Sequence, residues 1–353
     1  MSKKLIKNTI LYDTPKYLKQ RVVNSIVENN IGTYSPKAKP ELIQLTNKSI
    51  DDKIIECINK EAITIKIIDL LEINKGYRYT VLFNYDDINM DELKNECIDM
   101  NSEYYNSISD SVDDLSKLYL EDDEHIFIKF HTKIKVLEKG EAPKWQDVRY
   151  PILFVFHKKL GLFEARFDRL KYESDRNFYK TLMDTNLYWL HNKLNINWSH
   201  INMDSIIREI VDNHKDMVDE LIWAGELSKS KNITLKVGQD NIMPFFGELK
   251  IEIEKWKDKY KDKKDALDCL NDLDNYLEMT KKYANEKFRT LRWIKYSKNG
   301  KSIELDEPID LRVTFNYSET MIDLINIYDN ELNDMERIDY VVNFIGEIRN
   351  SIK

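Results

Sequence analysis

Glycine and proline are both scarce in this chain, with 9 and 7 of them among 353 residues. Such low numbers leave little material for flexible linkers or for the glycine-rich loops that bind phosphate. Cysteine is scarcer still, because the chain has only Cys57, Cys97 and Cys269, which lie far apart and form no CxxC pair. This pattern does not support a disulfide framework, so we expect reduced, buried thiols.

Long apolar segments are also lacking. No apolar run approaches the roughly 18 residues needed to span a bilayer, and residues 1–10 carry lysines without the apolar segment of a signal peptide. We therefore expect a soluble, cytoplasmic protein with no membrane partner.

Positive charge is not in excess, since 62 Asp and Glu residues against 54 Lys and Arg residues give a net charge of -8. This balance argues against a surface that wraps nucleic acid, although it permits a local basic patch.

The composition that is present is globular, with 42% hydrophobic and 33% charged residues. A chain of this length exceeds what one core usually supports. We expect an N-terminal α+β domain over 1–172 and a helix-rich C-terminal domain over 173–353. The richness in Ile, Lys, Asn, Asp and Tyr is typical of an AT-rich genome, such as that of a low-GC bacterium or its phage.

The clearest structural signal is a series of three β-patterned runs between residues 124 and 172. They cover Ile126–Leu137, Val148–Phe156 and Leu162–Leu170, and are rich in β-branched and aromatic residues. A short segment that ends at Gly161 joins the last two runs, which predicts a hairpin. The middle run is apolar on both faces and should be a central strand. In the last run Phe163, Ala165 and Phe167 alternate with charged residues, which we expect to face outward.

The remaining periodicities predict an α+β fold, with a mostly antiparallel meander sheet flanked by helices, followed by a helix-rich half with a second small β-meander. In the first half we expect helices near 15–30, 50–60, 93–104 and 115–119, and strands at 63–73 and 77–85. In the second half we expect helices near 178–190, 206–222, 245–260, 267–277, 321–328 and 338–345, and strands at 233–237, 289–296, 301–305 and 311–317.

One candidate for catalysis is a set of two carboxylates and a lysine. Asp240, Glu248 and Lys250 have a D…ExK arrangement, which resembles that of the restriction-endonuclease-like nucleases. The resemblance implies that the carboxylates hold Mg²⁺ and that the lysine acts at the attacking water or the phosphate. In that family the ExK lies on a strand, whereas the apolar spacing here predicts a helix. Mg²⁺ is expected only under this alternative, and otherwise we expect no cofactor, no metal and no catalytic residue.

A second candidate is the pair Arg208 and His214, which are separated by five residues. This spacing resembles the R-x(4–6)-H element of the HEPN ribonucleases, in which the two side chains would act at the RNA 2′-hydroxyl or the scissile phosphate. The resemblance covers seven residues. The β-rich remainder of the chain does not belong to that family.

Basic residues provide the other signal, because they gather around two predicted hairpins. The candidate nucleic-acid contacts are Arg149, Lys158, Lys159, Arg166 and Arg169 around the first hairpin, and Arg292, Lys298 and Lys301 around the second. Both groups are interleaved with aromatic residues, the mixture that phosphate contacts and base stacking use. The alternative is that these cations pair with neighbouring carboxylates on solvated sheet faces.

From these observations we expect a binding protein rather than an enzyme. The favoured hypothesis is a subunit of a bacterial complex that contacts nucleic acid through the basic hairpins, in a setting such as anti-phage defence. Other protein subunits are the expected partners. The alternatives are the Mg²⁺-dependent nuclease and a protein–protein interaction module that uses the helical apolar stripes.

Overall fold

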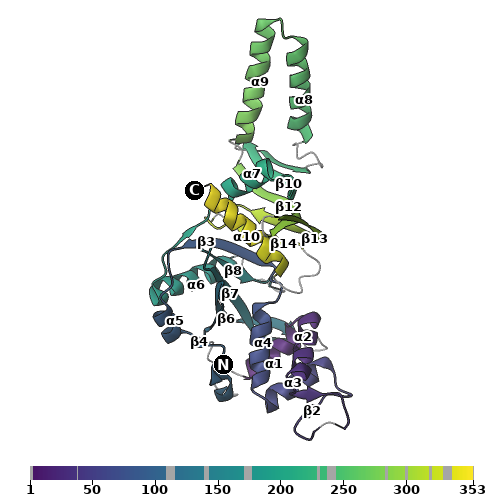
Figure 1. Cartoon of the computed structure of the whole chain (residues 1–353), viewed down its shortest axis with the longest axis vertical. Helices are drawn as coiled ribbons and strands as arrows, with labels where there is room; N and C mark the ends of the chain where they lie inside the picture. The colour runs from purple at the N-terminus through teal and green to yellow at the C-terminus, as the bar shows by residue number, and fades with distance from the viewer. Residues whose placement is uncertain are drawn as a thin grey trace. The chain divides into compact units, whose positions relative to one another are not determined.

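A computed structural model describes residues 3–37, 39–108, 116–138, 143–170, 177–228, 231–236, 244–282, 285–298, 301–317, 320–328 and 336–352. It confirms the predicted α+β class, with many helices and mostly antiparallel strands (Figure 1). The chain divides into two compact units, 1–199 with 331–336, and 200–330 with 337–353. The expected boundary between 172 and 173 lies outside the described residues and stays a prediction. None of the described helices has the length and apolar content required to cross a membrane.

The first unit is built on a sheet whose strands follow the order β3-β8-β7-β6-β5-β4. The strands are β3 (Tyr79–Tyr85), β4 (Ile98–Asp99), β5 (Leu118–Glu121), β6 (His125–Glu138), β7 (Lys144–His157) and β8 (Leu162–Phe167), and β9 (Trp198–His200) pairs with β3. Among the strands of the order β3-β8-β7-β6-β5-β4, all neighbours except β4 and β5 run antiparallel. The three central strands confirm the predicted runs, and β7 lies in the middle as its apolar faces require.

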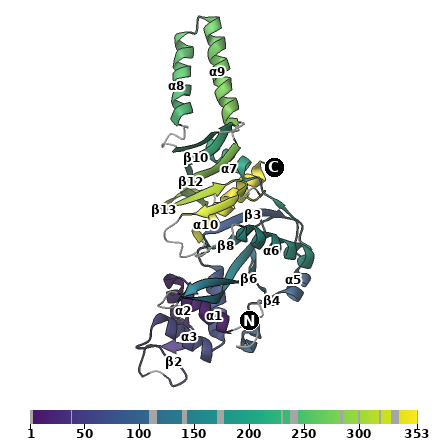
Figure 2. The same cartoon turned by 180° about the vertical axis from the view of Figure 1, so that it is seen from behind.

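Helices cover both faces of this sheet, as the two views of the chain show (Figures 1 and 2). They are α1 (Lys3–Tyr12), α2 (Lys16–Glu28), α3 (Ile50–Lys60), α4 (Ile63–Ile73), α5 (Met90–Glu96), the short 3₁₀-helix Glu103–Ser107 and α6 (Phe178–Leu194), with a small sheet of β1 (Gly32–Thr33) and β2 (Ile43–Gln44). Helices α1 to α4 pack against one another. Helix α6 lies on the aromatic face, where Trp189 contacts Phe130 and Tyr179 contacts Phe167.

The hairpin between β7 and β8 turns as the sequence predicted. Gly161 has φ of +60°. Glycine adopts this left-handed conformation at little energetic cost because it has no side chain. The amide groups of Leu160 and Gly161 both donate to the carbonyl of His157, at 3.2 and 3.1 Å. This turn sets the register that places Phe156 opposite Phe163.

Side chains of α1 form hydrogen bonds with the backbone groups at the edge of β7, beyond the end of β8. Asn8 donates its amide to the carbonyl of Asp147 at 3.1 Å, and Thr9 accepts from the backbone amide of Arg149 at 2.9 Å. An uncovered strand edge is a site for unwanted strand pairing. The first helix of the chain therefore protects the longest hairpin of the sheet.

The strands of the second unit are antiparallel and follow the order β11-β10-β12-β13-β14. Its strands are β10 (Val218–Ser228), β11 (Lys231–Lys236), β12 (Asn285–Lys298), β13 (Lys301–Thr314) and β14 (Leu324–Ile327). Its helices are α7 (Met203–Asn213), α8 (Pro244–Lys259), α9 (Lys264–Lys282) and α10 (Glu336–Ser351). Helices α8 and α9 form a hairpin that is inserted between β11 and β12.

Several predicted elements are wrong. The run Ile63–Ile73 is helix α4 and not a strand, because an apolar run of this kind satisfies either period and only packing decides between them. Four segments predicted as helical contain strands, namely those at β4, at β5, at the start of β10 and at β14. Pro308 does not end its strand, because β13 continues past it beside a register shift between Trp293 and Lys295, and bulges tolerate proline.

Candidate functional site

Strand β6 carries different chemistry on its two faces. Because side chains alternate along a strand, Phe130 and Thr132 point toward α6, whereas Lys129 and His131 point toward α4. The α6 face holds a cavity, and the α4 face holds a buried network of charges. Both are places where polar groups of the described residues could do chemistry.

The charge network joins α4 to strands β6 and β7. Asp69 and Glu72 are three residues apart and therefore lie on one face of α4. The ammonium group of Lys129 lies 2.8 Å from Asp69 Oδ1 and 2.5 Å from Glu72 Oε2. The guanidinium group of Arg149 reaches the same two oxygens at 2.8 and 2.9 Å. Two buried carboxylates are thus matched by two buried cations.

Burial and neighbouring charges shift the pKa values of the two carboxyls and of the adjacent histidine, His131. Burial alone would raise the pKa of Asp69 and Glu72, but Arg149 and Lys129 hold the pKa of both carboxyls below the usual range. Burial, together with the same two cations, lowers the pKa of His131 to about 3. The imidazole of His131 is therefore neutral beside a network with no net charge.

Asp69, Glu72 and His131 also have the residue types of a metal site, and their ligand atoms lie within 4.8 Å of one another. Asp69 Oδ2 and both ring nitrogens of His131 have no hydrogen-bond partner among the described residues. A divalent cation here would, however, have to displace Lys129 and Arg149, which already neutralise the carboxylates. The geometry fits an internal ion network better than a metal centre.

A second buried network lies farther along the same sheet face. Glu164 accepts hydrogen bonds from Thr80 at 3.0 Å and from Arg166, and its Oε1 lies 2.8 Å from the ring of His157. Burial would raise the pKa of Glu164, but Arg166 and His157 lower it. All four side chains are buried, so this network also faces the interior.

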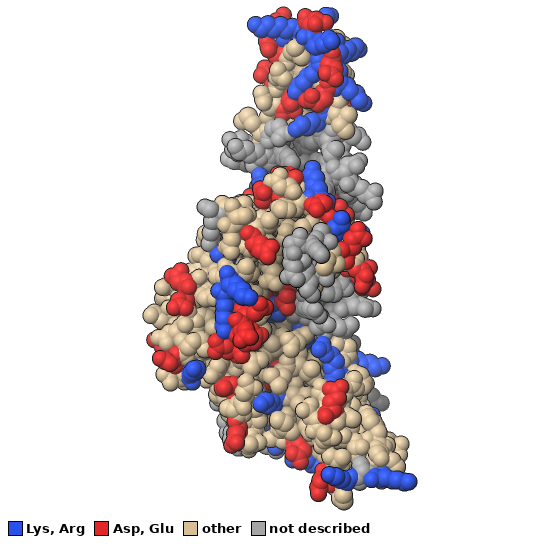
Figure 3. Space-filling model, in the orientation of Figure 1, with Lys and Arg blue, Asp and Glu red and all other residues tan. Residues whose placement is uncertain are grey.

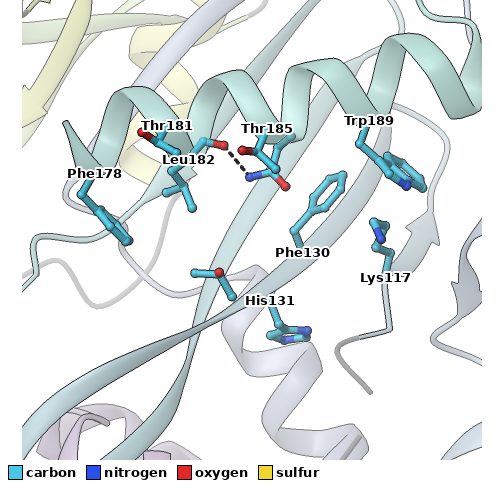
Figure 4. Close-up of a pocket in the computed structure, with 10 residues that line it drawn as sticks. Lys117, Phe130, His131, Phe178, Thr181, Leu182, Thr185 and Trp189 are labelled. Carbon is cyan, nitrogen blue, oxygen red and sulfur yellow. Dashed lines mark hydrogen bonds between the residues drawn. The ribbon is translucent and has the colours of Figure 1, made fainter. Parts of the chain in front are cut away.

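The cavity on the α6 face has a volume of about 410 Å³ (Figure 4). Figure 4 shows Phe178 and Phe130 on opposite sides of the space, with Leu182 pointing into it from α6 and His131 turned away toward the other layer. The rest of the lining is Lys117, Thr132, Thr181, Thr185, Asn186 and Trp189. Aromatic walls with a few hydroxyl and amide groups are typical of small-molecule sites.

Lys117 supplies the positive charge of this cavity. Its ammonium group lies 4.7 Å from the ring centre of Trp189 and 6.0 Å from that of Phe130. Trp189 and Phe130 meet edge to face, with their ring centres 5.2 Å apart. Within the described part of the chain, no carboxylate forms an ion pair with Lys117, so the charge is available to an anionic ligand.

The structure corrects the expectation that the charged residues of the first hairpin face outward. Arg149 and Arg166 are 0% and 3% exposed, and each binds a buried carboxylate. Neither can reach a phosphate group without breaking its network. The reason is that helix α4 covers the sheet face on which Arg149 lies, which strand alternation alone does not reveal.

The other predicted contacts are placed differently. Lys158 and Lys159 are exposed but bind Glu121 and Glu124, at 2.7 and 2.6 Å. Arg292 makes two hydrogen bonds to Asp310, at 2.7 and 2.8 Å. Arg169 is exposed. Lys298 and Lys301 pair across the β12–β13 hairpin through their backbones, and their side chains lie outside the described part.

The nuclease candidate is only partly described. Asp240 and the side chain of Glu248 lie outside the described residues, and Lys250 is exposed. Positions 248 and 250 lie in α8, as the apolar spacing predicted. The catalytic role of the three residues, and the Mg²⁺ it would need, stay predictions.

Arg208 and His214 belong to α7 and its C-terminal cap. Arg208 binds Asp204 and Glu286, both at 3.0 Å, whereas the ring of His214 packs edge-on against Phe344. Six residues of helix separate the two side chains by about 240° around the axis. Within one chain they therefore point in different directions, and a ribonuclease role stays a prediction.

Sequence reasoning missed the residues that make these sites, chiefly Asp69, Glu72, Lys117 and Trp189. Asp69 and Glu72 were hidden because their segment was interpreted as a strand. Two acidic residues three apart in an otherwise apolar run were the available signal, because buried carboxylates need cationic partners. Lys117 carried no signal, since the helix and strand that enclose it are distant in the chain.

No family model matches the chain, and a comparison with curated proteins found no match.

Proposed function

We propose that the protein is a non-catalytic binding protein whose α6 cavity takes one nucleotide, either free or at the end of a nucleic-acid strand. One observation carries the proposal. Three aromatic side chains, Phe130, Phe178 and Trp189, line a cavity of about 410 Å³ together with Lys117.

Each feature of the cavity corresponds to one part of a nucleotide. Stacking of a base on an aromatic side chain contributes about 1–3 kcal/mol and tolerates any base. A lysine binds phosphate as a point charge. Thr181, Thr185 and Asn186 offer hydroxyl and amide groups that can bond to sugar or base edges.

A single nucleotide suits this surface better than a long strand. Contact with a strand requires a row of available cations, because each phosphate contact neutralises one charge. In the first unit, Arg149 and Arg166 are buried and Lys158 and Lys159 are paired with carboxylates. The net charge of -8 opposes extended contact further.

Replacing Lys117 with methionine should weaken the binding of adenosine 5′-monophosphate about tenfold or more. The substitution keeps the apolar stem and removes a charge-assisted contact, which contributes about 1.5–3 kcal/mol. Isothermal titration calorimetry measures the change. Lys135→Met is the matched control, because Lys135 is an exposed lysine of β6 outside the cavity. Equal affinity of wild type and Lys117→Met would remove the phosphate role of Lys117.

The choice of ligands separates the two sources of the nucleotide. Adenosine and inorganic phosphate should each bind more weakly than the monophosphate, because each makes only part of the contacts. A 5′-phosphorylated oligonucleotide that binds more tightly than the monophosphate identifies a strand end as the ligand, and the reverse order identifies the free nucleotide. If none of these ligands binds, the proposed function is wrong.

The setting we propose is the bacterial cytoplasm, in an assembly with other protein subunits and with a role in anti-phage defence. The cysteines support the cytoplasmic part of this proposal, because reduced thiols are usual in the cytosol. The thiols of Cys57 and Cys97 are free and buried, and burial raises their pKa to about 11 and about 12, which makes them unreactive. Cys269 is exposed, contrary to the expected burial. A plaque assay on cells that express the chain with its neighbouring genes tests the defence role.

A further inference from the structure

The α8–α9 hairpin of the second unit leaves large apolar side chains exposed. Trp256 is 38% exposed and Tyr276 is 66% exposed. Figures 1 and 2 both show the two helices side by side, and Figure 3 shows charged side chains of both signs on the hairpin with uncharged ones between them. Two helices alone cannot cover all of their apolar surface, so such a hairpin is well suited to pairing with further helices.

The contact between the helices defines which residues share a face. Ile253 and Leu277 are buried along the line where α8 meets α9. Trp256 comes three residues after Ile253, about 60° from this line, and Tyr276 comes one residue before Leu277, about 100° from it. Because α9 runs antiparallel to α8, these rotations bring both rings to the same side. The same reasoning adds Lys259 and Asp272, and we call these four residues the hairpin face.

The residues that α8 and α9 contribute to the hairpin face also lie at similar heights along the two helix axes. The ion pair between Lys257 and Asp274, at 2.7 Å, aligns the two helices. Lys259 and Asp272 both lie two residues, about 3 Å, toward the tip from this pair. Trp256 and Tyr276 lie about 1.5 and 3 Å from it in the opposite direction. Trp256 and Lys259 on α8 therefore each have a complement at about the same level on α9, namely Tyr276 and Asp272.

We propose that the hairpin face binds the hairpin face of a second copy of this chain, forming a four-helix bundle about a two-fold axis parallel to the hairpin. Such an axis places α8 of one copy against α9 of its partner without changing heights. Trp256 then packs on the partner subunit's Tyr276 near the centre, and Lys259 pairs with the partner subunit's Asp272 at the rim. Both contacts occur twice, which is what a self-complementary face requires.

The test is a charge exchange on the full-length chain, with the dimer constant measured by sedimentation equilibrium. Wild type should dimerise. Lys259→Asp and Asp272→Lys should each weaken the dimer roughly tenfold or more, because each places like charges together at two sites. The double variant should recover the wild-type constant. All of these residues are exposed, so folding should be unaffected.

Asn271→Lys is the control, because Asn271 is exposed on α9 but lies about 100° from Asp272 around the helix. It should leave the dimer unchanged. A wild type that stays monomeric at every concentration overturns the proposal, even if another protein is found on the hairpin. A double variant that stays as weak as the single ones also overturns it, because the two charges would then not face each other.

Discussion

Replacing Arg149 with methionine is expected to lower the free energy of unfolding by about 3–5 kcal/mol. Methionine fills much of the space of the arginine stem but leaves Asp69 and Glu72 with Lys129 as their remaining cation. A buried carboxylate without its counter-charge costs more than the ion pair itself contributed. Denaturant unfolding, with hydrogen exchange of α4 and β6 to assign the change to the first unit, measures the loss.

Two companion variants make this prediction specific. Arg149→Met combined with Glu72→Gln should recover part of the lost stability, because the double variant removes one buried negative charge together with the positive charge of Arg149. Arg292→Met removes the arginine of the ion pair with Asp310, in which the Arg292 side chain is 42% exposed. This substitution should lower the free energy of unfolding by less than about 1 kcal/mol. If Arg149→Met costs no more than Arg292→Met, the network at α4 does not hold the sheet and the helices together.

The second large effect concerns acid. The pKa of His131 is about 3 in the folded chain and 6.5 ordinarily. Between these values the unfolded chain binds a proton that folded His131 does not. Stability should therefore fall as the pH drops below about 6.5, by up to about 1.4 kcal/mol per pH unit from this residue. Below the ordinary pKa values of 3.8 and 4.5, the lowered pKa of Asp69 and Glu72 adds to the loss.

His131→Gln isolates the histidine contribution. The glutamine does not titrate, so the slope of unfolding free energy between about pH 6 and 5 should become flatter, whatever the absolute stability of the variant. His191→Gln removes an exposed histidine of α6 and should keep the wild-type slope. An unchanged slope in His131→Gln would mean that the ring is protonated in the folded chain.

The central sheet shows how far sequence reasoning reaches. Alternation and β-branched residues predicted β6, β7 and β8, and the apolar pattern predicted that β7 is central. The same alternation led to the expectation that Arg166 and its charged neighbours face solvent, because a half-solvated sheet is the usual reason for such a pattern. It cannot distinguish solvent from a buried partner. Glu164, which binds Arg166 inside the protein, looked like any outward-facing residue.

The sequence could predict the α8–α9 interaction surface but not the α6 cavity. The α8 and α9 stripes were predicted from helical spacing, so the candidate interaction surface could be anticipated as a class. The cavity could not, because Lys117 precedes β5, Phe130 lies in β6 and Trp189 lies in α6. Nothing in local periodicity indicates that segments separated by dozens of residues will meet.

By itself, the sequence determined the α+β class, the central antiparallel strands and most of the helices, since these depend on periods of two and 3.6 residues within short windows. Only the tertiary structure decided that α4 supplies Asp69 and Glu72 to Lys129 and Arg149, and that Lys117 lies beside an aromatic cavity. The physical reason is that charge is compensated through space, so the role of a cation depends on which distant carboxylate, if any, reaches it.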